Sequence, residues 1–254
     1  MTFIQLTDPL QRYWLSGLLL LWACLLFGGF VFGKTDPKTN RRMPTWTRMT
    51  SSLTLVVASW SWYLFTQNSS IQWFSLLIAV GMTLGFVGDL CLARLVPLPQ
   101  PTLGGIAAFG LGHIAYIIAL LSFGNEYGLA APAPRWGALT VWLLIGLSGW
   151  YLVVFRGGKP TVLHKAALPY ALLLASTAGL ATGLALQAPA FIPLAIGGGL
   201  FLLSDLILAA ELFNDLKFPL IGDVVWLTYG PAQMLIVFAV NGALLVAGHP
   251  LPSS

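Results

Sequence analysis

Residues 71–96 read IQWFSLLIAVGMTLGFVGDLCLARLV, a nearly unbroken run of apolar side chains. A helix needs about 20 apolar residues to cross the hydrocarbon core of a bilayer, and this run is long enough. Seven further runs are continuous rather than alternating, which indicates helices and not the strands of a barrel. The sequence therefore predicts an all-α polytopic membrane protein, a bundle of eight transmembrane helices at residues 13–32, 50–65, 71–96, 103–123, 136–155, 163–186, 190–211 and 222–247.

The composition supports this fold class. Of 254 residues, 57% are hydrophobic and 8% are charged, whereas a soluble domain carries roughly 25% charged residues. So few charges exclude a soluble enzyme, a disordered chain and a nucleic-acid binder. Cys24 and Cys91 lie in apolar runs and indicate neither a disulfide framework nor a metal site. The breaks between runs are too short to separate domains, so we expect a single transmembrane domain over residues 1–254.

Basic residues are distributed unevenly between the connections. Only Arg12 and Arg135 fall on one side of the predicted bundle, and ten fall on the other. Because cytoplasmic loops carry the excess of lysine and arginine, we expect both chain ends to face away from the cytoplasm, in a bacterial inner membrane. The ten residues are Lys34, Lys38, Arg41, Arg42, Arg48, Arg94, Arg156, Lys159, Lys165 and Lys217.

Two acidic residues lie well inside apolar runs, Asp89 in the third and Asp205 in the seventh. A charge at membrane depth costs about 2.5–3.5 kcal/mol on insertion scales, so such residues usually face the bundle interior and serve a function. A structural aspartate near a helix end is the plainer alternative. Asp89 precedes Arg94, and Asp205 precedes Glu211, by similar lengths of helix that run toward the same side, so the two carboxyls are expected at a similar depth.

The segments around the two aspartates resemble each other. A shift by the 116 residues that separate Asp89 from Asp205 aligns several identical residues. The match indicates a possible four-plus-four parallel repeat, which would bring the third and seventh spans to equivalent places beside the centre. Chance similarity between two Leu- and Gly-rich helices is the alternative. The aligned residues are Gly81, Leu84, Asp89, Leu90, Leu92 and Ala93 on Gly197, Leu200, Asp205, Leu206, Leu208 and Ala209.

The span after each aspartate carries a pair of polar side chains on one helical face. His113 and Tyr116 are three residues apart, and Tyr229 and Gln233 are four apart. A lone histidine or tyrosine in a membrane helix more often forms a hydrogen bond between helices than catalyses a reaction. Their position after each aspartate makes a shared polar pocket the more attractive interpretation.

Two carboxyls close together in a medium of low dielectric constant do not both ionise easily, so they share a proton. Such a pair supplies an acid and a base from one residue type, which suits hydrolysis and suits proton-coupled transport equally well. The sequence contains no nucleophile elbow, Walker loop or zinc-binding spacing. It also departs from the motifs of intramembrane aspartyl proteases, since Phe86 replaces a required glycine and Gln233 a required leucine.

Together these motifs resemble the YhhN family of lysoplasmalogenase-like membrane proteins, in an order and spacing that cover most of the chain. The family tends to have a Lys-Pro pair entering the second helix, where this chain has Arg48-Met49, so the resemblance by itself does not assign Arg48 as a phosphate ligand. The motifs are Gly88-Asp89-Leu90-Cys91-Leu92, Phe109, His113-Ile114-Ala115-Tyr116, Pro169-Tyr170, Ser204-Asp205-Leu206-Ile207-Leu208, Thr228-Tyr229 and Ala232-Gln233.

The resemblance implies hydrolysis of the vinyl-ether bond of a lysoplasmalogen, a lysophospholipid, to a fatty aldehyde and a glycerophospho-base, without metal or cofactor. One of Asp89 and Asp205 would be the protonated acid, and the other would stabilise the cation and position water. The remaining residues would bind substrate or water or support the pair: His113, Tyr116, Tyr170, Tyr229, Gln233 and Arg48. A proton-coupled transporter of lipid or a small solute, and a scaffold with buried polar packing, are the competing interpretations.

Overall fold

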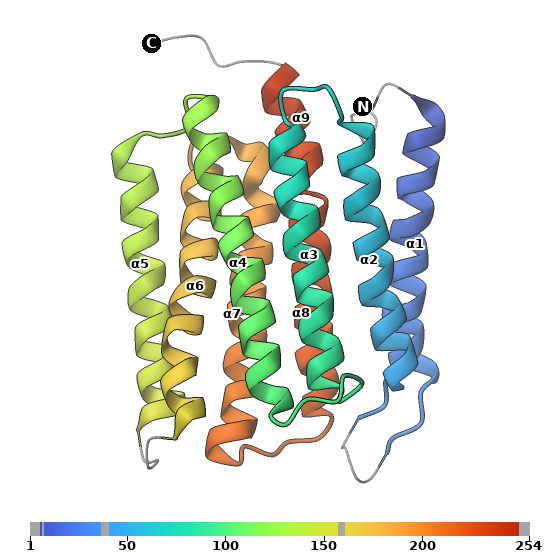
Figure 1. The fold of residues 1–254 in the computed structure, drawn as a ribbon, viewed down its shortest axis with the longest axis vertical. Coiled ribbons are helices and arrows are strands. Elements are labelled where there is room, and N and C mark those ends of the chain that lie inside the picture. The colour runs from blue at the N-terminus through green and yellow to red at the C-terminus, as the bar shows by residue number, and fades with distance from the viewer. Residues whose placement is uncertain (1–5, 7, 37–40, 157–160, 249–254) are drawn as a thin grey trace.

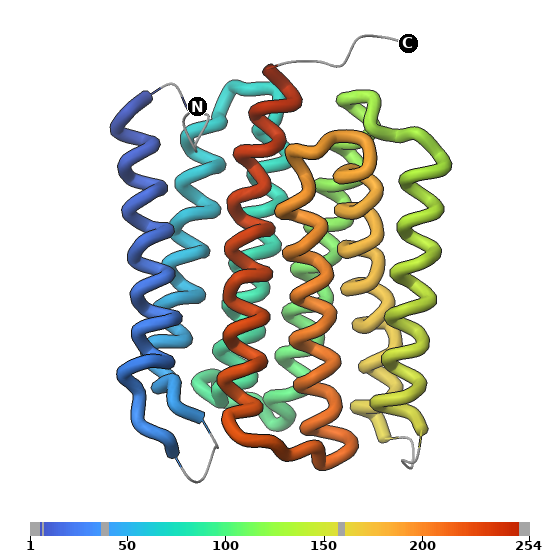
Figure 2. The backbone as a smooth tube through the Cα atoms, turned by 180° about the vertical axis from the view of Figure 1, so that it is seen from behind, coloured from blue at the N-terminus to red at the C-terminus, as the bar shows by residue number. Residues whose placement is uncertain are grey.

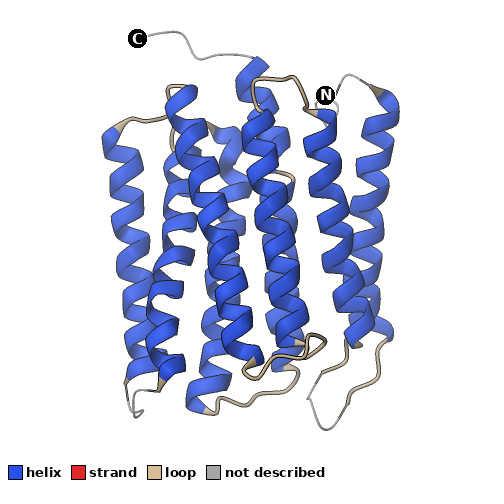
Figure 3. Ribbon diagram, in the orientation of Figure 1, coloured by secondary structure: helices blue, strands red, loops and turns tan. Residues whose placement is uncertain are grey.

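The computed structural model describes residue 6 and residues 8–36, 41–156 and 161–248, and over this part it is a bundle of long helices with no strand (Figures 1 and 3). A π-helical turn, Tyr151–Phe155, continues α5, and a 3-10 turn, Pro189–Phe191, leads into α7. The helices are α1 (Pro9–Phe32), α2 (Thr45–Phe65), α3 (Gln72–Leu92), α4 (Pro101–Glu126), α5 (Pro132–Trp150), α6 (Val162–Ala185), α7 (Ile192–Asn214), α8 (Ile221–Val237) and α9 (Ala239–Gly248).

The eight predicted spans correspond to these helices. The last span consists of α8 and α9, which follow one another as a single rod with a break at Phe238 (Figure 2). Seven helical segments of the described chain are long and apolar enough to cross a membrane. The remaining helix, α2, has 21 residues, as many as α3, but is rich in serine and threonine. The fold is therefore that of a multi-pass membrane protein.

The predicted boundaries differ from the structure by up to five residues, and two of the differences, in α2 and α3, have a clear local cause. The second span starts at Thr45 rather than at residue 50, because polar residues in its first turns hid it from a hydropathy pattern. The third span ends at Leu92 rather than at residue 96. There Arg94 adopts the left-handed conformation (φ 58°), and the N–H of Leu95 bonds to the carbonyl of Leu90, which closes the helix end.

Helices adjacent in the sequence pack against each other within each half of the chain, α1 to α4 and α5 to α8. Between the halves, α4 packs on α6 and α2 packs on α8. These two contacts are equivalent if α1–α4 are superposed on α5–α8, which is the relationship that the predicted four-plus-four repeat requires. The helices α1 and α5 lie at opposite edges of the bundle (Figure 1).

The outer surface is apolar, with strongly exposed side chains such as Leu20, Phe32 and Leu144. Such a surface suits contact with lipid tails rather than water. The connections that carry Arg41, Arg94 and Lys217 lie at one end of the bundle, and α1 begins and α9 ends at the other (Figure 1). Two of the ten residues of the basic side, Lys38 and Lys159, fall outside the described residues.

Candidate active site

Asp89 lies in the last turn of α3, and its side chain is buried (3% exposed). Small residues on this helix let its neighbours approach closely. A Cβ atom on Gly88 would lie 2.6 Å from the ring of Phe109, and one on Gly85 would lie 2.7 Å from the side-chain nitrogen of Gln233. The glycines that precede Asp89 therefore bring α4 and α8 up to the carboxyl group.

A chain of hydrogen bonds from three other helices ends on Asp89. Ser52 on α2 donates to Oδ2 at 2.5 Å, and Tyr229 on α8 donates to the same oxygen at 3.0 Å. Gln233 donates from Nε2 to the Tyr229 hydroxyl at 3.0 Å, and the Tyr116 hydroxyl donates to Oε1 of Gln233 at 3.2 Å. Each donor in this chain points toward Asp89. The network is therefore oriented to stabilise a negative charge on that carboxyl group.

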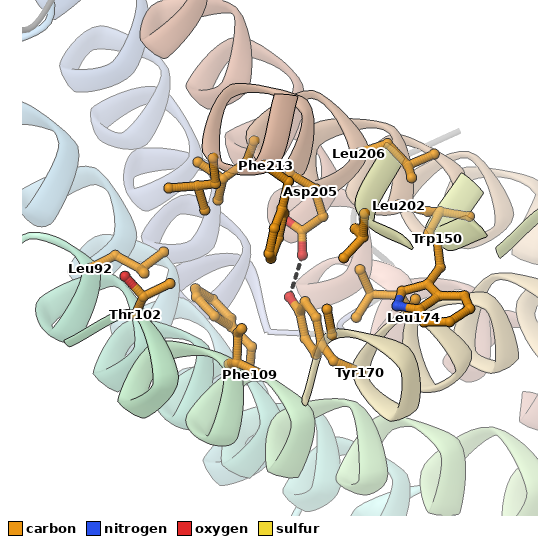
Figure 4. A pocket seen from close by; sticks show the side chains of 17 residues that line it. Leu92, Thr102, Phe109, Trp150, Tyr170, Leu174, Leu202, Asp205, Leu206 and Phe213 are labelled. Carbon is orange, nitrogen blue, oxygen red and sulfur yellow. Dashed lines mark hydrogen bonds between the residues drawn. The ribbon is translucent and has the colours of Figure 1, made fainter. Parts of the chain in front are cut away.

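Asp205 on α7 has a different environment. Its Oδ2 accepts a hydrogen bond from the hydroxyl of Tyr170 on α6 (Figure 4). The surrounding side chains are apolar, and Phe109, Leu202 and Phe213 lie around the pair in Figure 4. The second carboxyl is therefore held by a single donor in a mostly hydrocarbon setting.

Both carboxyls line one polar cavity of about 490 Å³ at the basic end of the bundle. The structure thus brings the predicted pair, from the third and seventh spans, to one cavity. Charged residues of both signs also line this cavity. They are Arg41, Arg48, Arg94 and Lys217, together with Glu211 and Asp215.

A second, narrower pocket of about 80 Å³ adjoins the polar cavity and is lined almost entirely by hydrocarbon. It lies between α4, α6, α7 and the π-helical turn, with Trp150 and Val154 at its lining. The two spaces share Asp205, Phe109 and Leu208 among their lining residues. Asp205 therefore stands at the junction of a polar space and an apolar one.

His113 lies beside the site rather than in it. Its Nδ1 shares a hydrogen bond of 2.9 Å with Thr177, and its Nε2 has no partner. Its ring packs edge-on against Phe201 at 4.5 Å and against Tyr170 at 6.4 Å between ring centroids. The side chain thus contacts Tyr170, which in turn bonds Asp205, and it supports the pocket wall.

Arg48 reaches the polar cavity from α2. Its guanidinium lies over the ring of Trp226 at 5.3 Å and donates to the hydroxyl of Thr45 at 3.0 Å. The side chain is 8% exposed. Five of the eight residues predicted for the site therefore line the two spaces, namely Asp89, Asp205, Arg48, Tyr229 and Tyr170. The other three are linked to them, His113 through Tyr170, and Gln233 and Tyr116 through the hydrogen-bond chain from Tyr229.

Sequence reasoning missed Ser52, Thr177 and Asp223. Ser52 belongs to the span with the weakest apolar signal, and its distance of 37 residues from Asp89 carries no periodic pattern. Asp223 lies at the start of the last span, where no sequence pattern distinguishes it. It is fully buried, and its carboxyl accepts hydrogen bonds from the backbone N–H groups of Arg42 at 2.6 Å and Met43 at 2.9 Å.

These features define a class of protein: a helical membrane protein with two acidic side chains on one polar cavity, one of them where the cavity meets an apolar pocket. The model of the YhhN family matches residues 43–240, most of the chain, and the chain belongs to this family. Membership suggests a lysoplasmalogenase-like membrane protein. No curated protein and no solved structure gives a significant match to the chain.

Proposed function

We propose that the protein is a membrane-embedded hydrolase that cleaves the vinyl-ether bond of lysoplasmalogens in a bacterial inner membrane. The observation that carries the proposal is the position of Asp89 and Asp205 on one cavity, with Asp205 at its junction with an apolar pocket. A hydrolase of an ether lipid needs an acid and a base at the point where the hydrocarbon chain meets the polar headgroup. Family membership supports the same reaction class.

The two adjoining spaces match the two ends of such a substrate. The polar cavity, with its basic residues, suits a phosphate-bearing headgroup. The pocket around Trp150 and Leu174 suits the first part of the alkenyl chain, with the rest of the chain extending toward the lipid. The bond to be broken would then lie beside Asp205.

The hydrogen bonds support different tasks for the two carboxyls. Asp89 accepts from Ser52 and Tyr229, and these donors favour its ionised form. Asp205 has one donor, Tyr170, and faces the apolar pocket. We therefore assign Asp205 as the group that carries the shared proton and Asp89 as the carboxylate.

The reaction follows from these assignments. Asp205 transfers its proton to the outer alkene carbon, which leaves an oxocarbenium ion that the carboxylate of Asp89 stabilises. Water adds to this cation and gives up a proton to Asp89. The resulting hemiacetal collapses, its hydroxyl proton passing through the carboxyls to the departing glycerol oxygen. The products are a fatty aldehyde and a glycerophospho-base, and the pair again holds one proton.

The test is aldehyde release from 1-alkenyl-glycerophosphocholine, followed by mass spectrometry. Asp89→Asn and Asp205→Asn should each lower turnover by about a hundred- to ten-thousand-fold, the usual contribution of a general acid or base. Glu126→Gln, at the exposed end of α4, is the matched control and should retain activity. Thermal unfolding would establish that each variant is folded.

Two results would count against the proposal. Near-normal turnover in either folded aspartate variant would rule out the two-carboxyl mechanism. Proton-dependent solute flux in liposomes, without aldehyde release from any lysolipid, would favour the proton-coupled transporter instead. A loss of folding without a specific loss of turnover would favour the scaffold.

A further inference from the structure

Three arginines line the polar cavity, and two of them, Arg41 and Arg48, share an unusual environment. They lie close enough to repel each other electrostatically. The Nε atom of each is buried and has no hydrogen-bond partner. Since a buried donor without a partner costs about 1–3 kcal/mol, and more for a charged group, two such donors at one cavity call for an explanation.

Neither nearby acid forms an ion pair within 4 Å with Arg41 or Arg48 among the described residues. Asp89 and Asp223 are the carboxylates close enough to act on Arg48. Asp89 is bonded by Ser52 and Tyr229, and Asp223 is bonded by backbone N–H groups. Among the described residues, the one ion pair within 4 Å joins Lys217 to Asp215 instead.

The surrounding structure holds both arginines in place. Trp226 lies beneath the guanidinium of Arg48, and Thr45 binds one of its terminal nitrogens. Arg41 passes so closely over Gly222 that its side chain leaves no room for a Cβ atom there. The backbone beside Arg41 is fastened to α8 through the carboxyl of Asp223. The two positive groups are therefore positioned before any ligand arrives.

We infer that Arg41 and Arg48 form a binding site for a phosphate group, the phosphodiester of the lipid substrate. This inference rests on the proposed function, since the same cavity contains the two carboxyls. Arginine is suited to the task because its planar fork donates two parallel hydrogen bonds to phosphate oxygens. An anion between the two groups would satisfy the free Nε donors and remove the repulsion between like charges.

The site would also set the register of the substrate. A phosphodiester fixed by Arg41 and Arg48 places the glycerol backbone, and the ether bond attached to it, at a defined distance from the carboxyls. The protein would then select lipids that carry a phosphate over neutral lipids with the same alkenyl chain. Specificity of this kind arises because a substrate without phosphate leaves the buried donors unpaired.

The first test compares two substrates, 1-alkenyl-glycerophosphocholine and 1-alkenylglycerol, which lacks phosphate. Arg48→Gln and Arg41→Gln should each raise KM for the first by about ten- to a hundred-fold, the effect of one lost charge-assisted hydrogen bond. The KM for 1-alkenylglycerol should change by no more than about two-fold, because this substrate has no phosphate and so loses no hydrogen bond to either arginine. Arg48→Lys should give an intermediate value, and Arg12→Gln, at the opposite end of α1, should change neither. Equal changes for both substrates would overturn the inference.

The second test measures binding without catalysis. Inorganic phosphate and glycerophosphocholine are added separately to the intact detergent-solubilised protein, and thermal unfolding is followed. Stabilisation of the parent protein that is lost in Arg48→Gln supports the site, and no stabilisation by either compound overturns it. Stabilisation by the diester alone identifies the lipid headgroup as the ligand, whereas stabilisation by inorganic phosphate alone contradicts a lipid site. Arg41 is only partly buried, so Arg41→Gln serves if Arg48→Gln does not fold.

These outcomes separate the inference from the proposed function. Phosphate-dependent stabilisation with no aldehyde release from any alkenyl lipid would retain the binding site and refute the hydrolase. Aldehyde release with equal KM values in the parent protein and both arginine variants would retain the hydrolase and refute the phosphate site.

Discussion

The hydroxyl of Tyr229 donates a hydrogen bond of 3.0 Å to Oδ2 of Asp89, across 140 residues of sequence and between the two halves of the bundle. The bond joins the carboxyl of the first half to a helix of the second. The site is thus completed only when both halves are folded against each other. Loss of this single bond should therefore lower activity more than it lowers the stability of the fold.

Removing the Tyr229 hydroxyl provides a direct prediction. Tyr229→Phe deletes one of two hydrogen bonds to Asp89, and a hydrogen bond to a charged group is worth about 1.5–3 kcal/mol. Aldehyde release should fall by about ten- to a hundred-fold. Tyr116→Phe, two bonds further from the carboxyl, should have a smaller effect, and the exposed Tyr13→Phe should have none. Turnover of Tyr229→Phe at the level of the parent protein would contradict the proposed role.

Close packing of α6 on α7 predicts a stability effect. A Cβ atom on Gly198 would lie 2.8 Å from the backbone Cα of Ala178, so the two helices would have to separate. Gly198→Ala should destabilise the protein by about 1–3 kcal/mol, the usual cost of overpacking. Gly17→Ala, where nothing lies within 4 Å, should be neutral or slightly stabilising. Thermal unfolding in detergent measures both, and equal midpoints would contradict this packing.

The buried carboxyl of Asp223 is predicted to hold the connection between α1 and α2 in place. Asp223→Asn replaces one acceptor oxygen by a donor that faces a backbone N–H, at a cost of about 1–3 kcal/mol. The connection between α1 and α2 should then be cleaved faster in limited proteolysis. Asp8→Asn is the control, because asparagine caps a helix as well as aspartate does. Unchanged cleavage in Asp223→Asn would show that the loop is held by other contacts.

The distribution of basic residues predicts the orientation in the membrane. Alkaline phosphatase, which is active only outside the cytoplasm, should be active when fused to the C-terminal end. It should be inactive when fused after Pro99, in the connection between α3 and α4 at the basic end. The opposite pattern of activities would place the polar cavity on the outer face of the membrane.

Much of this architecture can be predicted from the sequence, because the bilayer imposes a simple rule on every span. Eight apolar runs predict eight crossings, and the cost of a charge at membrane depth singles out Asp89 and Asp205. Helical spacing correctly puts Tyr229 and Gln233 on one face. These predictions succeed because they depend on local pattern or on one strong energetic penalty.

The contacts between distant helices could not be predicted in the same way. The bond from Ser52 to Asp89 depends on how α2 packs on α3, which no local pattern encodes. The apolar pocket is also a property of packing, since Leu, Ala and Phe residues read alike whether they face lipid or a cavity. The role of Asp223 was hidden because its partners are backbone N–H groups, which every residue but proline supplies.

The junction of the polar cavity and the apolar pocket at Asp205 also has a consequence for product release in the proposed reaction. In the proposed reaction the aldehyde would leave into the hydrocarbon by way of the pocket lined by Trp150, and the glycerophospho-base would leave into water by way of the cavity lined by Arg41. The two products would leave by different routes, so neither would block the release of the other. Separation of the products into lipid and water would favour hydrolysis even if the equilibrium constant of the reaction were small.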